Sequence, residues 1–170
     1  MCIRDSAGTV LAGNKGSLGT GNLIVITGGT GTLQSSTDLT GTNKIANGVT
    51  LTGTAALRLG GTNDFELGGV ITSSTTNGTI TINGTNTVIL SGANTYTGAT
   101  AVNSGTLRLT GSLGNTPVTV GTTGTIAGEG AIGATGSLSF NNGSTIRVDG
   151  STTGAMTCLL YTSPSPRDRG

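Results

Sequence analysis

The sequence predicts an all-β chain that winds into a parallel β-helix, or β-solenoid, with a β-sandwich as the alternative. Three observations support this prediction. Glycine accounts for 32 of 170 residues, whereas aromatic residues make up 2%, too few to fill a core between two packed sheets. The triplet Gly-Thr-Asn recurs at Gly41, Gly61 and Gly84, a period near twenty residues that is typical of solenoids. Short runs rich in β-branched residues fill the intervals, and no stretch has helical periodicity.

The two ends of the chain are expected to be foreign to this fold. Residues 1–6 (MCIRDS) and residues 158–170 (beginning CLLYTSPSPRD) can be back-translated into complementary base strings that resemble the two sides of a transposase-type sequencing adapter. We therefore predict that the biological segment is 7–157 and that its reading frame continues into further coils and an anchor. Both cysteines, Cys2 and Cys158, fall in the excluded ends, so no disulfide is expected.

Strands are expected where aliphatic and β-branched residues cluster between turn residues. The first is Leu23–Thr27 (LIVIT), whose unbroken apolar character suits a strand covered on both faces. Later strands are expected to begin at Val49, Ala56, Asp64, Gly69, Thr79, Thr87, Thr106, Pro117, Ser137 and Thr145. Residues that tolerate positive φ are expected to turn the chain at Asn47-Gly48, Asn77-Gly78, Asn83-Gly84 and Asn142-Gly143. At about 20–45 residues per repeat, the segment would hold about four to seven coils.

Alternation within the runs predicts a narrow apolar interior. In Thr106–Leu109, the side chains of Leu107 and Leu109 point to one face and those of Thr106 and Arg108 to the other. Stacked thin coils would place such leucines in one column with the valines and isoleucines of the other runs. We therefore expect Leu107 and Leu109 inside the solenoid and Arg108 outside.

Residues 88–109, VILSGANTYTGATAVNSGTLRL, contain three short β-type runs and two turns. This stretch closely resembles the autotransporter-associated β-strand repeat of bacterial surface and secreted proteins, through Leu90, Gly92–Gly98, Val102 and Gly105–Leu109. The resemblance implies a right-handed β-helix that is exported from the cell and is extracellular or at the cell surface, associated with the outer membrane. It implies no particular ligand.

Charge and composition exclude several classes of function. The formal net charge of +1 provides no basic field for nucleic acid or anionic membranes. The chain has no histidine, and the segment 7–157 has no cysteine, so it lacks common groups for base and nucleophilic catalysis. We expect a non-enzymatic, adhesin-like stalk with no direct membrane insertion. Its expected partners are neighbouring coils, extracellular glycans, and host or neighbouring cell surfaces. The alternatives are a β-helix carbohydrate-active enzyme and a glycan- or ice-binding solenoid.

The acidic pair Asp64 and Glu66 is the one arrangement with catalytic spacing. On a strand, carboxylates at i and i+2 lie on one face about 6.6 Å apart along the chain, a spacing compatible with a pair of glycosidase acids. Phe65 and Leu67 point the other way. The simpler interpretation is a solvated outer face over a buried inner one, and no catalytic residue is predicted.

The remaining motifs are interpreted as structural. Gly128, Gly130 and Gly133 match G-x-G-x-x-G, but ATGSLSF follows instead of a helix, so a coil corner is expected and no cofactor. The acidic residues are scattered and lack the G-G-x-G-x-D repeat of calcium-binding solenoids, so no metal site is expected. Thr-x-Thr pairs such as those at Thr50 and Thr79 have irregular spacing and are interpreted as plain outward strand positions.

Overall fold

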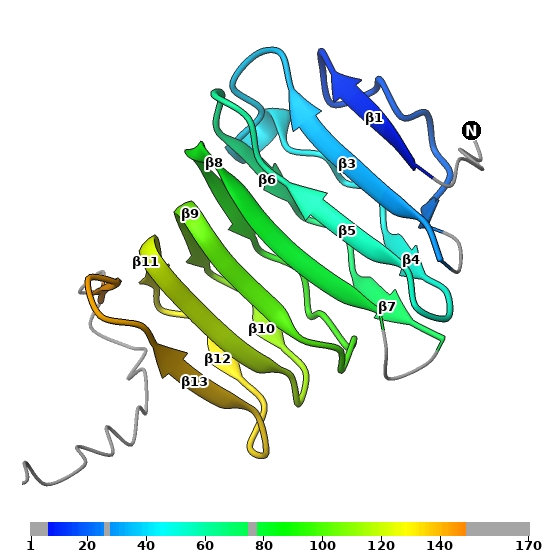
Figure 1. Ribbon diagram of the computed structural model, residues 1–170. Helices are drawn as coiled ribbons and strands as arrows, with labels where there is room; N and C mark the ends of the chain where they lie inside the picture. The colour runs from blue at the N-terminus through cyan, green and yellow to red at the C-terminus, as the bar shows by residue number, and fades with distance from the viewer. Residues whose placement is uncertain (1–6, 26–27, 75–77, 149–170) are drawn as a thin grey trace, which may run out of the picture.

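The computed structural model describes residues 7–25, 28–74 and 78–148, and these form a parallel β-solenoid of about seven turns (Figure 1). Every strand pairing among the described residues is parallel, which confirms the predicted architecture and rules out the β-sandwich. This part of the chain contains no α-helix, only a 3₁₀ turn, η1, at Gly41–Asn43. The turn count agrees with the upper end of the expected range.

One large sheet of nine strands forms two sides of the solenoid. Its path runs β1-β3-β5-β8-β9-β11-β13, while β6 pairs with β8 and β14 pairs with β11. The bounds of its strands are β1 Ala7–Ala12, β3 Thr30–Ser35, β5 Ala56–Leu59, β6 Phe65–Leu67, β8 Thr79–Leu90, β9 Thr100–Leu109, β11 Pro117–Gly128, β13 Ser137–Phe140 and β14 Thr145–Arg147. The long strands β8, β9 and β11 bend across both sides, with register shifts between them at the corner.

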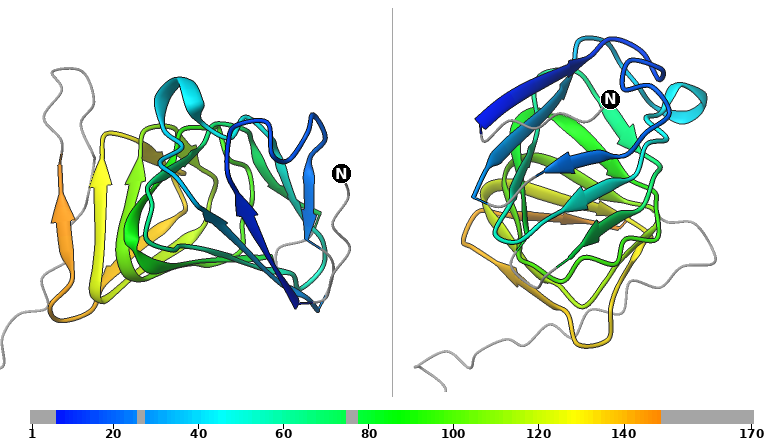
Figure 2. Two further views of the ribbon diagram at one scale, coloured as in Figure 1. Left: turned by 90° about the horizontal axis from the view of Figure 1, so that it is seen from above. Right: turned by 90° about the vertical axis from the view of Figure 1, so that its right-hand side faces the viewer.

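The third side is made of shorter pieces. A three-stranded sheet of order β2-β4-β7 is followed along the axis by a two-stranded sheet, β10-β12, and a bridge between Ala93 and Ser112. The bounds are β2 Leu23–Val25, β4 Val49–Leu51, β7 Ile71–Ser73, β10 Ser112–Leu113 and β12 Ala131–Ile132. Each coil therefore stacks on the coil before it, in chain order (Figure 2).

Aliphatic side chains fill the interior in columns that run along the axis. The register aligns one residue from each coil in a column of Val10, Leu33, Leu59, Ile82, Val102, Val120 and Phe140. Leu107 and Leu109 are fully buried, and Arg108 between them is partly exposed. The predicted inward and outward positions are confirmed. Burial of these columns is the main favourable contribution to the stability of the fold.

The expected strands are present, although their bounds differ in places. The runs that begin at Thr79 and Thr87 join into one strand, β8. The strand expected at Leu23–Thr27 is observed as Leu23–Val25, since residues 26–27 lie outside the described residues. The first strand is not the one at Leu23, because β1 at Ala7–Ala12 precedes it with only Val10 and Leu11 as large aliphatic residues. Strand β3 is also absent from the prediction, because Leu33 is its only large aliphatic residue. Its ladder is specified by the strands on either side of it.

The turn prediction is only partly right. Among the glycines of the four Asn-Gly pairs, only Gly143 has a positive φ, of 92°, and Asn77 lies outside the described residues. Gly84 lies within β8, where an added Cβ would be 2.5 Å from the backbone nitrogen of Gly61 in the preceding coil. This glycine is therefore required by the close approach of two coils and not by its own φ.

The proposed segment boundaries remain predictions. The described solenoid begins at Ala7, the first residue of the predicted segment 7–157. The adapter-like ends, residues 1–6 and 158–170, and the stretch 149–157 lie outside the described residues.

Candidate functional site

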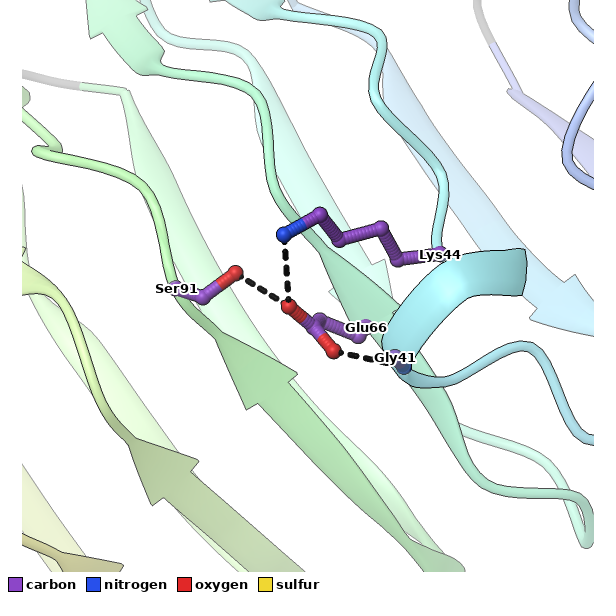
Figure 3. A network of polar contacts seen from close by, with 4 residues as sticks. All are labelled: Gly41, Lys44, Glu66 and Ser91. Atoms are coloured by element: carbon purple, nitrogen blue, oxygen red, sulfur yellow. Dashed lines mark hydrogen bonds and ion pairs between the residues drawn. The ribbon is translucent and has the colours of Figure 1, made fainter.

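The carboxylates of Asp64 and Glu66 both form hydrogen bonds to neighbouring coils. The carboxylate of Glu66, on β6, accepts hydrogen bonds from the hydroxyl of Ser91 at 2.5 Å and from the backbone N–H of Gly41 at 2.9 Å. The ammonium group of Lys44 lies 3.3 Å from the same oxygen that Ser91 contacts (Figure 3). These groups come from the coils before and after β6, so one carboxylate ties three successive coils together.

The environment of Glu66 favours its charged form. Only 8% of the residue is exposed, which corrects the expectation of a solvated face: the turn η1 and Lys44 cover it. Burial alone would raise the pKa of Glu66. The hydrogen bonds from Ser91, Gly41 and Lys44 and the positive charge of Lys44 together lower this pKa below its usual value. Both carboxylate oxygens are thus already occupied by protein groups.

Asp64 has a different structural role from Glu66. Its carboxylate accepts the backbone N–H of Thr87 in the next coil at 2.6 Å. Its own backbone N–H donates to the carboxylate of Asp38 in the preceding coil at 3.1 Å. Asp38 and Asp64 therefore form a ladder that satisfies backbone donors at one corner of successive coils.

The G-x-G-x-x-G motif forms a coil corner, as expected. An added Cβ would lie 2.1 Å from the Leu109 carbonyl oxygen at Gly128 and 2.4 Å from the Gly111 carbonyl oxygen at Gly130. Gly130 pairs with the preceding coil through its N–H, which donates to the Leu109 carbonyl at 2.8 Å. The strand β12 follows, so these glycines allow coils to approach each other.

A buried polar cluster fixes the GANTYTG stretch. The hydroxyl of Tyr96, which is fully buried, lies 2.7 Å from the hydroxyl of Thr100. Thr100 lies 3.4 Å from Thr116, whose hydroxyl donates to the Gly98 carbonyl. Burial raises the pKa of Tyr96 to about 12, against the opposing effect of its hydrogen bond with Thr100. The cluster lies within the core and offers no accessible reactive group.

Threonines are aligned across coils more regularly than their sequence spacing indicated. Thr87, Thr106, Thr125 and Thr145 occupy one register position in four successive coils. Sequence spacing concealed this row because coil length varies. The row does not extend into the preceding coil, where Asp64 stands next to Thr87 and accepts its backbone N–H.

A polar groove lies at the corner between the two sides of the large sheet. It is open to solvent, offers about 580 Å³ and crosses several coils. We call it the corner groove, and its lining includes Leu11, Gln34, Ser36, Thr62, Asn83, Thr85 and Ser104. Sequence reasoning missed it, because its residues come from separate coils and share no motif. The Gly-Thr-Asn triplets at Gly61 and Gly84, both of which also line it, were the available signal.

The described residues offer neither a metal-binding cluster nor a membrane-spanning helix. No group of three or more His, Cys, Asp or Glu side chains in this part of the chain is placed to hold a metal ion. The same residues contain no helical segment with the length and hydrophobicity of a membrane span.

The stacked parallel coils, with their continuous interior columns, define a β-solenoid repeat protein. Residues 80–109 match the passenger-associated-transport-repeat family. The match begins within β8 and ends with β9, and so extends eight residues upstream of the repeat recognised at 88–109. Repeat and solenoid together fit an autotransporter passenger repeat protein. Comparison with curated proteins and with solved structures gave no match.

Proposed function

We propose that this solenoid is a non-enzymatic stalk of an exported bacterial surface protein, of the autotransporter passenger type and with an adhesin-like role. The observation that supports it most directly is the passenger-associated repeat at residues 80–109, located on the long strands of the stack. The family suggests an exported, cell-surface protein. We also propose that the full-length protein is associated with the outer membrane.

The architecture suits extension. Strands of neighbouring coils are about 4.8 Å apart, so seven coils span about 34 Å along the axis. Each coil contacts the one before it and the one after it, so further coils would lengthen the rod without changing its cross-section. A rod of this kind can hold a distal surface away from the cell.

The acidic pair supports a structural role over a catalytic one. A glycosidase needs one carboxyl group that can donate a proton and a second that can reach the substrate. Here the Glu66 carboxylate is buried and bonded on both oxygens, and the Asp64 carboxylate accepts a backbone N–H of the next coil. We propose that both groups maintain coil stacking.

Surface labelling of cells tests the export part of the proposal. An epitope inserted at the exposed Asn142-Gly143 turn of the full-length gene, expressed in its native host, should be stained by antibody on intact cells. A cytoplasmic protein with the same epitope should be stained only after permeabilisation. Staining of the tagged protein only in permeabilised cells would contradict export.

A polysaccharide assay tests the absence of catalysis. The purified chain should release no products from pectin, alginate or glucan. Glu129→Gln serves as the matched control for Glu66→Gln, because Glu129 is an exposed carboxylate on a later coil. Product release that is abolished by Glu66→Gln and kept by Glu129→Gln would identify the protein as an enzyme.

A further inference from the structure

We propose that the corner groove binds a neutral saccharide chain. The groove is open to solvent and offers about 580 Å³ across several coils, so a ligand would lie along the surface and not inside an enclosed pocket. The lining of the groove includes Gly61 and Gly84, at a point where two coils approach closely. This inference is independent of whether the protein is exported, and it adds a binding activity to the proposed stalk.

The chemistry of the lining selects the ligand class. Its side chains are amides, hydroxyls and the leucine Leu11, and none is ionisable. Amides and hydroxyls provide both donors and acceptors, which match sugar hydroxyl groups that also do both. A charged polymer would find no counter-charge in this lining. Leu11, with 60% of its surface exposed, offers an apolar contact for the C–H face of a sugar ring.

The groove follows the solenoid axis, which favours a chain over a compact ligand. Leu11 pairs with Gln34, and Asn83 pairs with Ser104, so successive coils contribute groups at matching levels. Such groups recur about every 4.8 Å along the axis. The Ser104 hydroxyl donates to the Asn83 side-chain oxygen at 3.2 Å, which orients the Asn83 amide.

A buried amide ladder supports the groove from behind. Asn63 donates to the Ser35 carbonyl at 3.0 Å, and Asn86 donates to the Asn63 carbonyl at 2.8 Å. Asn86 is 4% exposed, and its Oδ1 is the buried side-chain oxygen that no group pairs with among the described residues. A Cβ added to Gly84, which lines the groove, would lie 2.4 Å from this oxygen. The Asn86 oxygen therefore lies directly behind the groove. The hydrogen bonds from Asn63 and Asn86 hold this part of the lining in place before any ligand arrives.

The backbone at this corner argues against an extended peptide. A peptide that adds to a sheet needs an edge strand with unpaired N–H and C=O groups. Here β5 pairs with β8, and β8 pairs with β9, so the strand β8 has a neighbour on each side. At Asn83 and Ser104, which pair with each other, recognition therefore falls to side chains, which suits a polyhydroxylated ligand.

Titration of the isotope-labelled chain by NMR tests this proposal with defined probes. The neutral probes are cellohexaose, maltohexaose and N-acetylated chitohexaose, and hexagalacturonate is the charged comparator. We expect at least one neutral probe, at millimolar concentration, to shift amide resonances at residues 34–36, 61–63, 83–85 and 104. Hexagalacturonate should leave these resonances unchanged.

Matched variants locate the contact. Asn83→Ala and Gln34→Ala should each weaken binding about fivefold, the effect of one lost hydrogen bond. Asn142→Ala, at an exposed asparagine on the last coil, should bind like the unmodified chain. The proposal is overturned if no neutral probe shifts the groove resonances, if hexagalacturonate binds equally well, or if the groove variants bind like Asn142→Ala. None of these outcomes bears on surface labelling, so failure here is distinct from failure of the stalk proposal.

Discussion

The early coils (residues 7–74) and the middle coils (residues 79–128) bury the same kind of apolar column but close their corners differently. In the early coils, strands are three to six residues long, and the carboxylates of Asp38, Asp64 and Glu66 bond to neighbouring coils. In the middle coils, β8, β9 and β11 are 10 to 12 residues long and run through the corner.

Coil length explains this difference. Between Thr30 and Ala56 the register advances by 26 residues, whereas between Ala101 and Thr119 it advances by 18. Longer coils contain segments outside the ladder, whose backbone donors need side-chain acceptors. In the shorter coils, the long strands run through the corner and pair with the neighbouring coils there. One core can therefore be enclosed both by corners that carry carboxylate bridges and by corners through which a long strand passes.

The largest effect is expected where the two regions are alike. Leu107→Asp in the middle coils and Leu57→Asp in the early coils should each destabilise the chain by about 4 kcal/mol or prevent folding, because an unpaired charge enters a dry column. Urea unfolding followed by circular dichroism measures this. Thr110→Asp, at an exposed position, is the control. If Leu57→Asp lowered the free energy of unfolding much less than Leu107→Asp, the two regions would not share a common core.

Glycine substitutions should separate a corner where two backbones approach closely from a corner that is open. An added Cβ at Gly111 would lie 2.3 Å from the Gly92 carbonyl oxygen, so Gly111→Ala should cost about 2–3 kcal/mol through overpacking. At Gly13, in an early coil, the nearest atom would be the Ser36 hydroxyl at 3.4 Å, and Gly13→Ala should be nearly neutral. Urea unfolding gives the free energy of unfolding of each variant, and the two values are compared with that of the unmodified chain. Equal costs would contradict the distinction between the corners.

The carboxylate bridge of the early coils should make stability depend on pH. The pKa of Glu66 is lowered in the folded state, so the folded chain holds fewer protons than the unfolded chain near the usual value of 4.5. The contribution of Glu66 is therefore complete above that pH and is lost as pH falls through the lowered pKa. Glu66→Gln should cost about 1–2 kcal/mol at pH 7 and less in acid.

Urea unfolding at neutral and acidic pH measures this dependence. Glu129→Gln, at an exposed site, should match the unmodified chain at both pH values. If Glu66→Gln lost the same stability in acid as at neutral pH, the charge of this carboxylate would not be what stabilises the early coils.

The smallest effect is expected in the buried hydroxyl cluster of the middle coils. Tyr96→Phe removes the 2.7 Å contact with Thr100 and should cost about 1 kcal/mol. A double-mutant cycle with Thr100→Val isolates the pairwise energy. A coupling energy indistinguishable from zero would show that packing of the ring alone fixes this stretch.

The sequence was sufficient to predict the residues that face the interior. Alternation placed Leu107 and Phe65 correctly, since inward positions depend on neighbours two residues away. It could not reveal what lies against the outside. Glu66 was expected in solvent because Gly41 and Ser91 are each 25 residues away, and coil length varies. The corner groove was missed for the same reason.

The parallel register between consecutive coils also bears on how the chain reaches its native state. Each coil pairs with the coil 18 to 26 residues before it, so no contact in the ladder requires closure of a long loop. Folding can therefore advance one coil at a time, with every completed coil serving as the template for the next. Such a chain can acquire its structure from whichever end becomes free first, before the rest of the polypeptide is available.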